Sequence, residues 1–385
     1  PLSETSFIGW MRKHLFSSVF NSLLTIVTLY IIYITFEGLW SWGIADAVWI
    51  AENRRECFNI SADGACWAGV IAWLDSIFYG RYPREELWRI NLGLFFLFIW
   101  MAPLWLPRVK AKISIGLSTV FLYPFLAGYL FSGGDKGIFM QIMLTAAIVC
   151  LAGNTIHAII GVFTGRSLAE FLLRLFGKTD AQEKSQRTIL ITIATLSFVL
   201  VFVFQMRWNV EGVPWTRWGG LFLTLVIAGI GIASALPGGI ILALGRRSRM
   251  PLMRVLSTSF IELFRSVPLI TVLFMATTMF PLFMPEGFAL NKLVQVIIAV
   301  CLFNACYMAE IVRGGLQTIP KGQFEAAHTV GLGYWTTMGL IITPQALKNM
   351  IPNIVGNFIW MLKYTTLVSI IGLFDVLGML RSVSK

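Results

Sequence analysis

The segment Glu325-Ala-Ala-His-Thr-Val-Gly331, followed by Ile341-Ile-Thr-Pro344, decides how the rest of this chain is interpreted. It lies in a mixed polar stretch between two long apolar runs, after residues 313–315 (RGG) and 319–322 (IPKG), which interrupt the helical pattern. Pro320 is typical of a helix start, and Gly331 and Gly333 of a helix end. We predict a short helix over residues 323–330, a turn at 331–333 and a second short helix from Tyr334. Two such amphipathic helices cannot lie in hydrocarbon, so they are expected at the membrane surface.

The composition around this segment is that of a membrane protein. The 385-residue chain is 57% hydrophobic and 13% charged, whereas soluble domains carry about 25% charged residues. The net charge of +11 could suggest a nucleic-acid partner. We exclude nucleic acid because the Lys and Arg residues stand in short clusters between apolar runs, as topology signals do. The chain is therefore predicted to be an all-α, polytopic membrane protein.

About nine apolar runs are long enough to be transmembrane helices, since roughly 20 residues cross a bilayer core. They cover residues 18–38, 92–106, 113–131, 138–163, 189–206, 219–244, 267–284, 293–312 and 351–371. With the N-terminus in the cytoplasm, the basic clusters fall mostly inside, as the positive-inside rule requires. Residues 41–89 then form a Trp-rich insert outside the cell, and residues 166–187 an amphipathic connector inside it.

Several motifs together resemble one family of transporters. The spacing of residues 325–331 and 341–344 is similar to the EAA loop of bacterial ABC importer permeases. Residues 259–268 (SFIELFRSVP), 307–315 (YMAEIVRGG) and 362–367 (LKYTTL) resemble permeases of the polar amino-acid branch. With its long N-terminal half, the chain is most similar to the large permease subunit of general L-amino-acid importers.

The resemblance implies a division into two modules. Residues 219–385 would form the permease core of a type I ABC importer, with the EAA-like loop at 313–348. Residues 1–206 would form an N-terminal transmembrane extension that carries the insert at 41–89. The family has a further, tenth span after the ninth, so we expect the chain to be trimmed near its C-terminus.

The resemblance also implies a function and partners. The chain would be a multi-pass permease of the bacterial inner membrane that imports L-amino acids by alternating access. The loop would dock the ATPase through Glu325, Ala326, Ala327, Gly331 and Pro344. The implied partners are ATP-binding subunits, a second homologous permease subunit, a periplasmic amino-acid-binding protein and membrane lipid.

The sequence contains no P-loop, so ATP hydrolysis is expected on a partner and the chain is not expected to be an enzyme. We expect no cofactor, no catalytic residue and no metal site, because the His and Cys residues do not form a ligand pattern. An ion-coupled secondary transporter is the alternative, but neither an acidic mid-membrane site nor an inverted repeat is visible. A membrane-embedded enzyme is a third option, disfavoured by the lack of a catalytic cluster.

Ionisable groups within or beside the spans are functional candidates because they are costly there. Glu310 and Arg313, and likewise Glu262 and Arg265, are spaced i,i+3 and so share a helix face. They could be static ion pairs at the membrane boundary, which would tolerate a charge swap, or the inner gate of the translocation path. The other polar candidates for the path are Asn304, Asn357, Lys363 and Thr365.

Two of the five cysteines, Cys57 and Cys66, share the polar insert on the predicted outer side. Disulfides persist in the periplasm, and the intervening loop is short enough to close. We predict a disulfide between them, and two free thiols are the alternative.

Overall fold

The computed structural model of the chain describes residues 7–52, 54–109, 112–164, 195–204, 209–285 and 290–383. Within these ranges the regular structure is helical, with only isolated β-bridges between single residues. The prediction of an all-α protein is thus confirmed. The chain forms two compact units, residues 1–75 and residues 76–385, and each is described by itself.

The first unit begins with α1 (Phe7–His14) and α2 (Val19–Trp40). Ser18 caps α2 by accepting a hydrogen bond from the backbone N–H of Asn21. At 1.5 Å per residue, α2 is about 33 Å long, enough to cross a bilayer. None of its side chains is buried within the chain, so this helix presents apolar surface on every side, as a span surrounded by lipid does.

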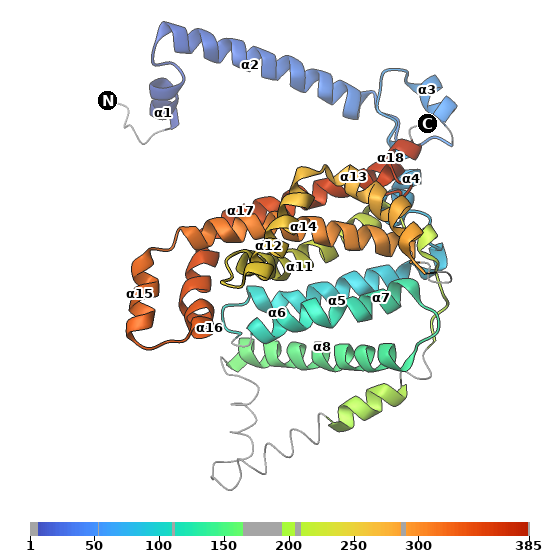
Figure 1. Cartoon of the computed structure of the whole chain (residues 1–385). Coiled ribbons are helices and arrows are strands. Elements are labelled where there is room, and N and C mark those ends of the chain that lie inside the picture. The colour runs from blue at the N-terminus through green and yellow to red at the C-terminus, as the bar shows by residue number, and fades with distance from the viewer. Residues whose placement is uncertain are drawn as a thin grey trace. The chain divides into compact units, whose positions relative to one another are not determined.

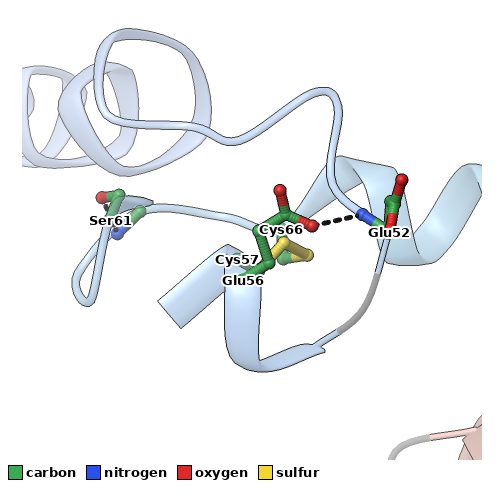
Figure 2. The surroundings of a disulfide bond; sticks show 6 residues. Glu52, Glu56, Cys57, Ser61 and Cys66 are labelled. Atoms are coloured by element: carbon green, nitrogen blue, oxygen red, sulfur yellow. Dashed lines mark hydrogen bonds between the residues drawn. A yellow bond between two sulfur atoms is a disulfide. The ribbon is translucent and has the colours of Figure 1, made fainter. Parts of the chain in front are cut away.

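A disulfide closes the insert that follows α2. Cys57 on α3 (Arg54–Ile60) is bonded to Cys66, which directly precedes α4 (Trp67–Tyr79), and their Cα atoms are 5.9 Å apart (Figure 2). Polar groups order the same loop, because Glu56 accepts a hydrogen bond from the backbone N–H of Glu52 at 2.8 Å. The insert is therefore a small cross-linked body rather than an extended loop.

The second unit begins with a helical bundle. Helices α5 (Leu87–Trp105), α6 (Lys112–Phe121), α7 (Tyr123–Ser132) and α8 (Ile138–Thr164) pack side by side (Figure 1). The predicted third span is divided at Leu122, because Pro124 near the start of α7 cannot donate the hydrogen bond that would continue α6. Arg89 on α5 is completely buried and donates to the carbonyl oxygens of Leu130 and Glu211.

The remaining long helices form a second bundle. They are α11 (Gly220–Arg246), α12 (Pro251–Ser266), α14 (Lys292–Gln317) and α17 (Thr343–Tyr364). Helix α14 lies between α11 and α17 (Figure 1). Small residues allow the close approach of α11 to α14: a Cβ added at Gly239 would come 2.6 Å from a side-chain atom of Met308, and one at Gly238 2.8 Å from Ala305.

Three glycines join the two bundles at one end. The backbone N–H of Gly220 donates to the carbonyl oxygen of Phe374 at 2.8 Å. Gly220 has a φ of +63°, and a Cβ there would lie 2.3 Å from the carbonyl oxygen of Ile77. Gly80, with a φ of +67°, approaches Gly219 so closely that its Cβ would lie 2.4 Å from the Gly219 Cα. We call Gly80, Gly219, Gly220 and Phe374 the glycine junction; side chains at the glycines would separate the bundles.

The predicted count of about nine spans is not confirmed. Among the described residues, six helices are long and apolar enough to cross a membrane, or seven if a bent pair counts as one span. That pair is α12 and residues 269–283, which meet at 106°. The latter begin with α13 (Leu269–Phe274) and correspond to the predicted seventh span.

The predicted ninth span also differs. Helix α17 begins earlier, at Thr343, and ends at Tyr364, where a 3-10 turn (Thr365–Ser369) follows. Because it carries several amide side chains and two lysines, α17 is not among the six helices that are apolar enough to cross a membrane. A further helix, α18 (Val376–Val383), comes after that turn.

Two other predictions concern segments that the structure describes only in part or divides differently. Of the predicted fifth span, only the helical residues 195–204 are described, and the amphipathic connector at 166–187 lies outside the described residues. The compact units do not follow the predicted modules, since residues 76–206 share a unit with residues 219–385. The division into an extension and a core stays a prediction.

Candidate functional site

The EAA-like segment leaves the second bundle at the end of α14. The sequence predicted a break at residues 313–315, but α14 continues through both glycines to Gln317, and the chain turns only at residues 318–320. Gly315 serves packing instead: a Cβ there would lie 2.1 Å from a side-chain atom of Met350 on α17. Helix α15 (Lys321–Thr329) then begins directly after Pro320, two residues before the predicted start at Gln323.

Gly331 terminates this helix in the manner that the sequence predicts. Its φ is +78°, which L-residues with a side chain rarely adopt. The backbone N–H of Leu332 donates to the carbonyl oxygen of Ala327 at 3.1 Å, as in a Schellman C-cap. The turn therefore reverses the chain and sends it back toward the bundle.

The second predicted helix is not a separate one. Helix α16 (Tyr334–Thr336) runs through a π-helical segment (Thr337–Ile342) directly into α17. Pro344 lies at the start of α17 and lacks an N–H, so it cannot make the regular hydrogen bond. A π-helical segment just before such a residue accommodates it without ending the helix. Residues 334–364 thus form one continuous helix that leads from the loop into the bundle.

The predicted docking residues do not all face outward. Glu325, Ala326, Gly331 and Pro344 are exposed, whereas Ala327 is only 3% exposed and lies against the chain itself. Two contacts hold α15 to the rest of the unit: the guanidinium of Arg247 lies 5.9 Å from the ring centroid of Phe324, and Gln345 donates to Gln323 at 3.1 Å. Ala327 is therefore small because its own chain packs against it.

The outer surface of this loop is partly apolar. Tyr334, Trp335 and Leu340 are among its exposed large side chains, as is Val330 beside the turn. Figure 1 shows α15 and α16 extending beyond the ends of the helices that they connect. Large apolar side chains exposed on a projecting element are typical of a protein-binding site.

A cluster of five charged side chains lies nearby, where α11, α12 and α14 meet. Glu310 on α14 accepts from Arg313 at 2.8 Å and also pairs with Arg246 at the end of α11 and with Arg265 of α12 at 3.6 Å. Arg246 in turn contacts Glu262 of α12 at 3.1 Å. We call Arg246, Glu262, Arg265, Glu310 and Arg313 the charge cluster. Its three arginines and two glutamates carry a net charge of +1.

The sequence predicted part of this arrangement. Glu310 and Arg313 are paired as their spacing suggested, but Glu262 contacts Arg246 rather than Arg265, and Arg265 contacts Glu310. Arg246 was missed as a member, because the basic run at residues 246–249 signalled only topology. The charge cluster therefore joins three helices, whereas the sequence indicated two separate pairs, each within one helix.

The other polar candidates are not brought into this cluster. Asn304 is completely buried and donates to the carbonyl oxygen of Gly231 at 3.0 Å. Asn357 is buried on α17, and the buried hydroxyl of Thr365 donates to the carbonyl oxygen of Leu362. Lys363 is exposed. In the part of the chain that the structure describes, no group of three or more His, Cys, Asp or Glu side chains could hold a metal ion.

Comparison with known proteins gives a consistent result. The family described as "Binding-protein-dependent transport system inner membrane component" matches residues 235–383. The chain is 38% identical over 367 residues to an inner membrane amino-acid ABC transporter permease (YhdY) of Escherichia coli, covering 95% of this chain and 80% of that protein. It is 35% identical over 392 residues to the glutamate/glutamine/aspartate/asparagine transport system permease BztC of Rhodobacter capsulatus, covering 100% of this chain and 86% of that protein.

A shorter relative matches less of the chain. The probable glutamine ABC transporter permease GlnP of Bacillus subtilis is 37% identical over 161 residues, which is 42% of this chain and 72% of that protein. The two relatives that span nearly the whole chain carry the assignment, and the matched family region includes the charge cluster and the EAA-like loop. The chain belongs to the family of binding-protein-dependent transport system inner membrane components and is an ABC transporter permease.

Proposed function

We propose that this chain is the permease subunit of an importer for L-amino acids in a bacterial inner membrane. The names of the relatives support amino acids as the substrate class and the inner membrane as the location. The family assignment favours an ATP-driven importer over the ion-coupled transporter considered as the alternative. ATP would be hydrolysed by separate ATP-binding subunits, so the chain itself would not be an enzyme.

Helix α15 and the turn at Gly331 would dock the ATP-binding subunit. The observation that carries this assignment is the projecting loop, which exposes Glu325 and Ala326 on α15 and the apolar Trp335 just after the turn. A partner that binds this surface would hold the inner end of the 334–364 helix. Movement of the ATP-binding subunit would then be transmitted along that helix into the bundle.

The charge cluster is positioned to respond to that movement. Glu310 and Arg313 lie near the end of α14 that leads into α15, and Glu310 also binds arginines of α11 and α12. We propose that the cluster is an inner gate, whose ion pairs rearrange as α15 moves. The static alternative is a fixed structural contact that keeps the three helices together throughout the cycle.

The match to the binding-protein-dependent family supports the remaining partners that we propose. A second permease related to residues 219–385 would complete the translocation path, and a periplasmic amino-acid-binding protein would deliver the substrate. Residues 1–206 would form the N-terminal extension, with its disulfide-linked insert on the periplasmic side.

Co-purification and transport together test this function. The tagged chain, expressed with its native partners, is expected to retain an ATP-binding subunit and a second permease. In vesicles supplied with binding protein, the complex is expected to import a labelled L-amino acid only when ATP is present. Import driven by an ion gradient without ATP, or no import of any common amino acid, would contradict the proposal.

A further inference from the structure

Helix α4 of the outer insert presents its large apolar side chains away from the chain. Trp67, Val70, Ile71 and Leu74 are spaced i, i+3, i+4 and i+7 and therefore lie on one face. Val70, Ile71 and Leu74 are 42%, 58% and 45% exposed. Of the α4 side chains that the structure describes, Ala68 alone is buried, and it packs into the small core of the insert.

This arrangement is the reverse of that in a water-soluble body. A helix that packs on a protein core normally turns its large apolar face inward and its polar face to water. Helix α4 instead packs through one methyl group and leaves its larger side chains uncovered. Trp49 extends the uncovered surface, because its ring is 53% exposed and stacks on Trp67 with 5.9 Å between the centroids. We call Trp49, Trp67, Val70, Ile71 and Leu74 the α4 face.

The end of α2 fixes the level of the insert relative to a bilayer. The residues from Val19 to Glu37 cover about 28 Å at 1.5 Å per residue, close to the hydrocarbon thickness of about 30 Å. Glu37 is exposed, and a carboxylate is costly in hydrocarbon, so Glu37 marks the end of the apolar layer. Trp40 and Trp42 follow it, at the headgroup level where tryptophan is enriched.

The insert is joined directly to this end of α2. The backbone N–H of Ala65 donates to the carbonyl oxygen of Trp42 at 2.8 Å, and the indole N–H of Trp67 donates to that of Gly43 at 2.8 Å. The disulfide closes the same body (Figure 2). Helix α4, which starts at Trp67, therefore begins at the headgroup level. Its 13 residues are about 20 Å long, too short to cross the bilayer.

We propose that the α4 face lies in the lipid bilayer, with α4 in the plane of the headgroups beside the end of α2. Val70, Ile71 and Leu74 enter the outermost hydrocarbon, and the indole rings of Trp49 and Trp67 lie at the headgroup level. The insert is then anchored to the membrane by a short amphipathic helix in addition to the span that precedes it. This inference concerns a lipid surface and does not depend on which substrate is imported.

The charges of the insert specify the kind of lipid contact. Residues 41–75 carry five carboxylates and two arginines, a net charge of −3. Interfacial helices that bind through charge carry Lys and Arg on their polar face, whereas the side of α4 that holds Ala68 and Ala72 carries Asp75. Binding of the α4 face therefore depends on its apolar area, and anionic lipid is not required.

Spin labels at single cysteines test the contact. The complex is placed in nanodiscs of phosphatidylcholine, with the free cysteines Cys150, Cys301 and Cys306 replaced by alanine and the disulfide intact. Collisions of the nitroxide with O₂, which dissolves in lipid, are compared with collisions with a water-soluble nickel chelate. At Ile71→Cys and Leu74→Cys we expect O₂ collisions to exceed nickel collisions several-fold. We expect the same ratio when phosphatidylglycerol is added.

Ala72→Cys and Asp63→Cys are the matched controls. Ala72 is exposed on the opposite side of α4, and Asp63 is exposed in the loop that the disulfide closes. Both labels lie on the same small body as Ile71, but outside the α4 face. Their ratio of O₂ to nickel collisions is expected to be several-fold lower than at Ile71. The parent variant, without an added cysteine, gives the background signal.

Three outcomes would overturn the proposal. Nickel collisions at Ile71 and Leu74 as frequent as those at Asp63 would place the α4 face in water. Labels at both positions that are immobilised and protected from O₂ and nickel alike would show that a protein covers the face. A high ratio that requires phosphatidylglycerol would contradict contact through apolar area. Because Ile71 and Leu74 are both surface positions, either variant decides the question if the other fails to fold.

Discussion

Removal of the Glu310 charge tests the energetics of the charge cluster. One carboxylate oxygen of Glu310 contacts Arg246 and Arg265, and the other accepts a hydrogen bond from Nε of Arg313 at 2.8 Å and lies 2.8 Å from its Nη2. Glu310→Gln would leave three arginines facing one another with only Glu262 to balance them. The net charge of the cluster would change from +1 to +2.

The magnitude follows from burial. Breaking a fully buried ion pair costs about 3–5 kcal/mol. The three arginine side chains are 26–35% exposed, so water compensates part of the lost charge. We expect Glu310→Gln to lower the free energy of unfolding by about 2–3 kcal/mol.

Glu262→Gln is the matched control. It removes the same charge from the same cluster, but the Glu262 side chain is 55% exposed and pairs only with Arg246 among the described ion pairs. Such an exposed pair contributes about 1 kcal/mol or less. The assay is denaturant unfolding of the purified protein in detergent, followed by tryptophan fluorescence. A loss for Glu310→Gln no larger than that for Glu262→Gln would refute the central position of Glu310.

The charge cluster also changes the result expected when the charges of Glu310 and Arg313 are exchanged. Glu310→Arg with Arg313→Glu would preserve an isolated pair, as the sequence suggested. In the structure the new arginine would face Arg246 and Arg265, so the swap is expected to destabilise the protein at least as much as Glu310→Gln. It therefore cannot separate a static pair from a gate. The ratio of ATP hydrolysed to amino acid imported, measured in the milder Glu310→Gln variant, is the better test of gating.

Three further predictions concern the loop, the insert and the glycine junction. Gly331→Asp places a side chain at a φ of +78°, and Ala327→Trp forces a ring into a position that is 3% exposed. Both are expected to abolish ATP-driven uptake without preventing membrane insertion. Normal uptake by Gly331→Asp with the ATPase bound would contradict the docking assignment, and normal uptake by Ala327→Trp would contradict the packing of α15 against its own chain. Cys57 and Cys66 are expected to resist an impermeant thiol reagent in unreduced membranes, and ready labelling of both would exclude the disulfide. Gly220→Ala is expected to lower the melting temperature, because its Cβ would lie 2.3 Å from a backbone carbonyl oxygen. An unchanged melting temperature would contradict the close backbone contact at the glycine junction.

Local features of the EAA-like segment could be predicted from sequence. Pro320 and Gly331 act through backbone geometry, which depends on the residue itself, so the turn at Gly331 and the ends of α15 to within two residues could be predicted. The continuity of residues 334–364 could not be predicted in this way. Gly339 and Pro344 suggest interruption, whereas the π-helical segment, which packs against α15, leads into α17 without a break.

The charge cluster could be predicted only within one helix. The i,i+3 rule identified Glu310 with Arg313 because both are on α14. The partner of Glu262 is on α11, and the side chain that faces it depends on the crossing of two helices, which no local pattern contains. The contact between the rings of Tyr307 and Trp360 was missed for a related reason: aromatic residues are common in apolar spans, and a contact across α14 and α17 is visible only in three dimensions.

The glycine junction also has a consequence for protein engineering. Its contacts run from backbone to backbone, between Gly80 and Gly219 and between Gly220 and Phe374. A chimera that joins this core to the N-terminal half of another permease would therefore need a glycine in the position of Gly80, whatever the similarity of the remaining surface. A donor with any other residue there would hold the two halves apart, so this position is the first to inspect when such grafts are chosen.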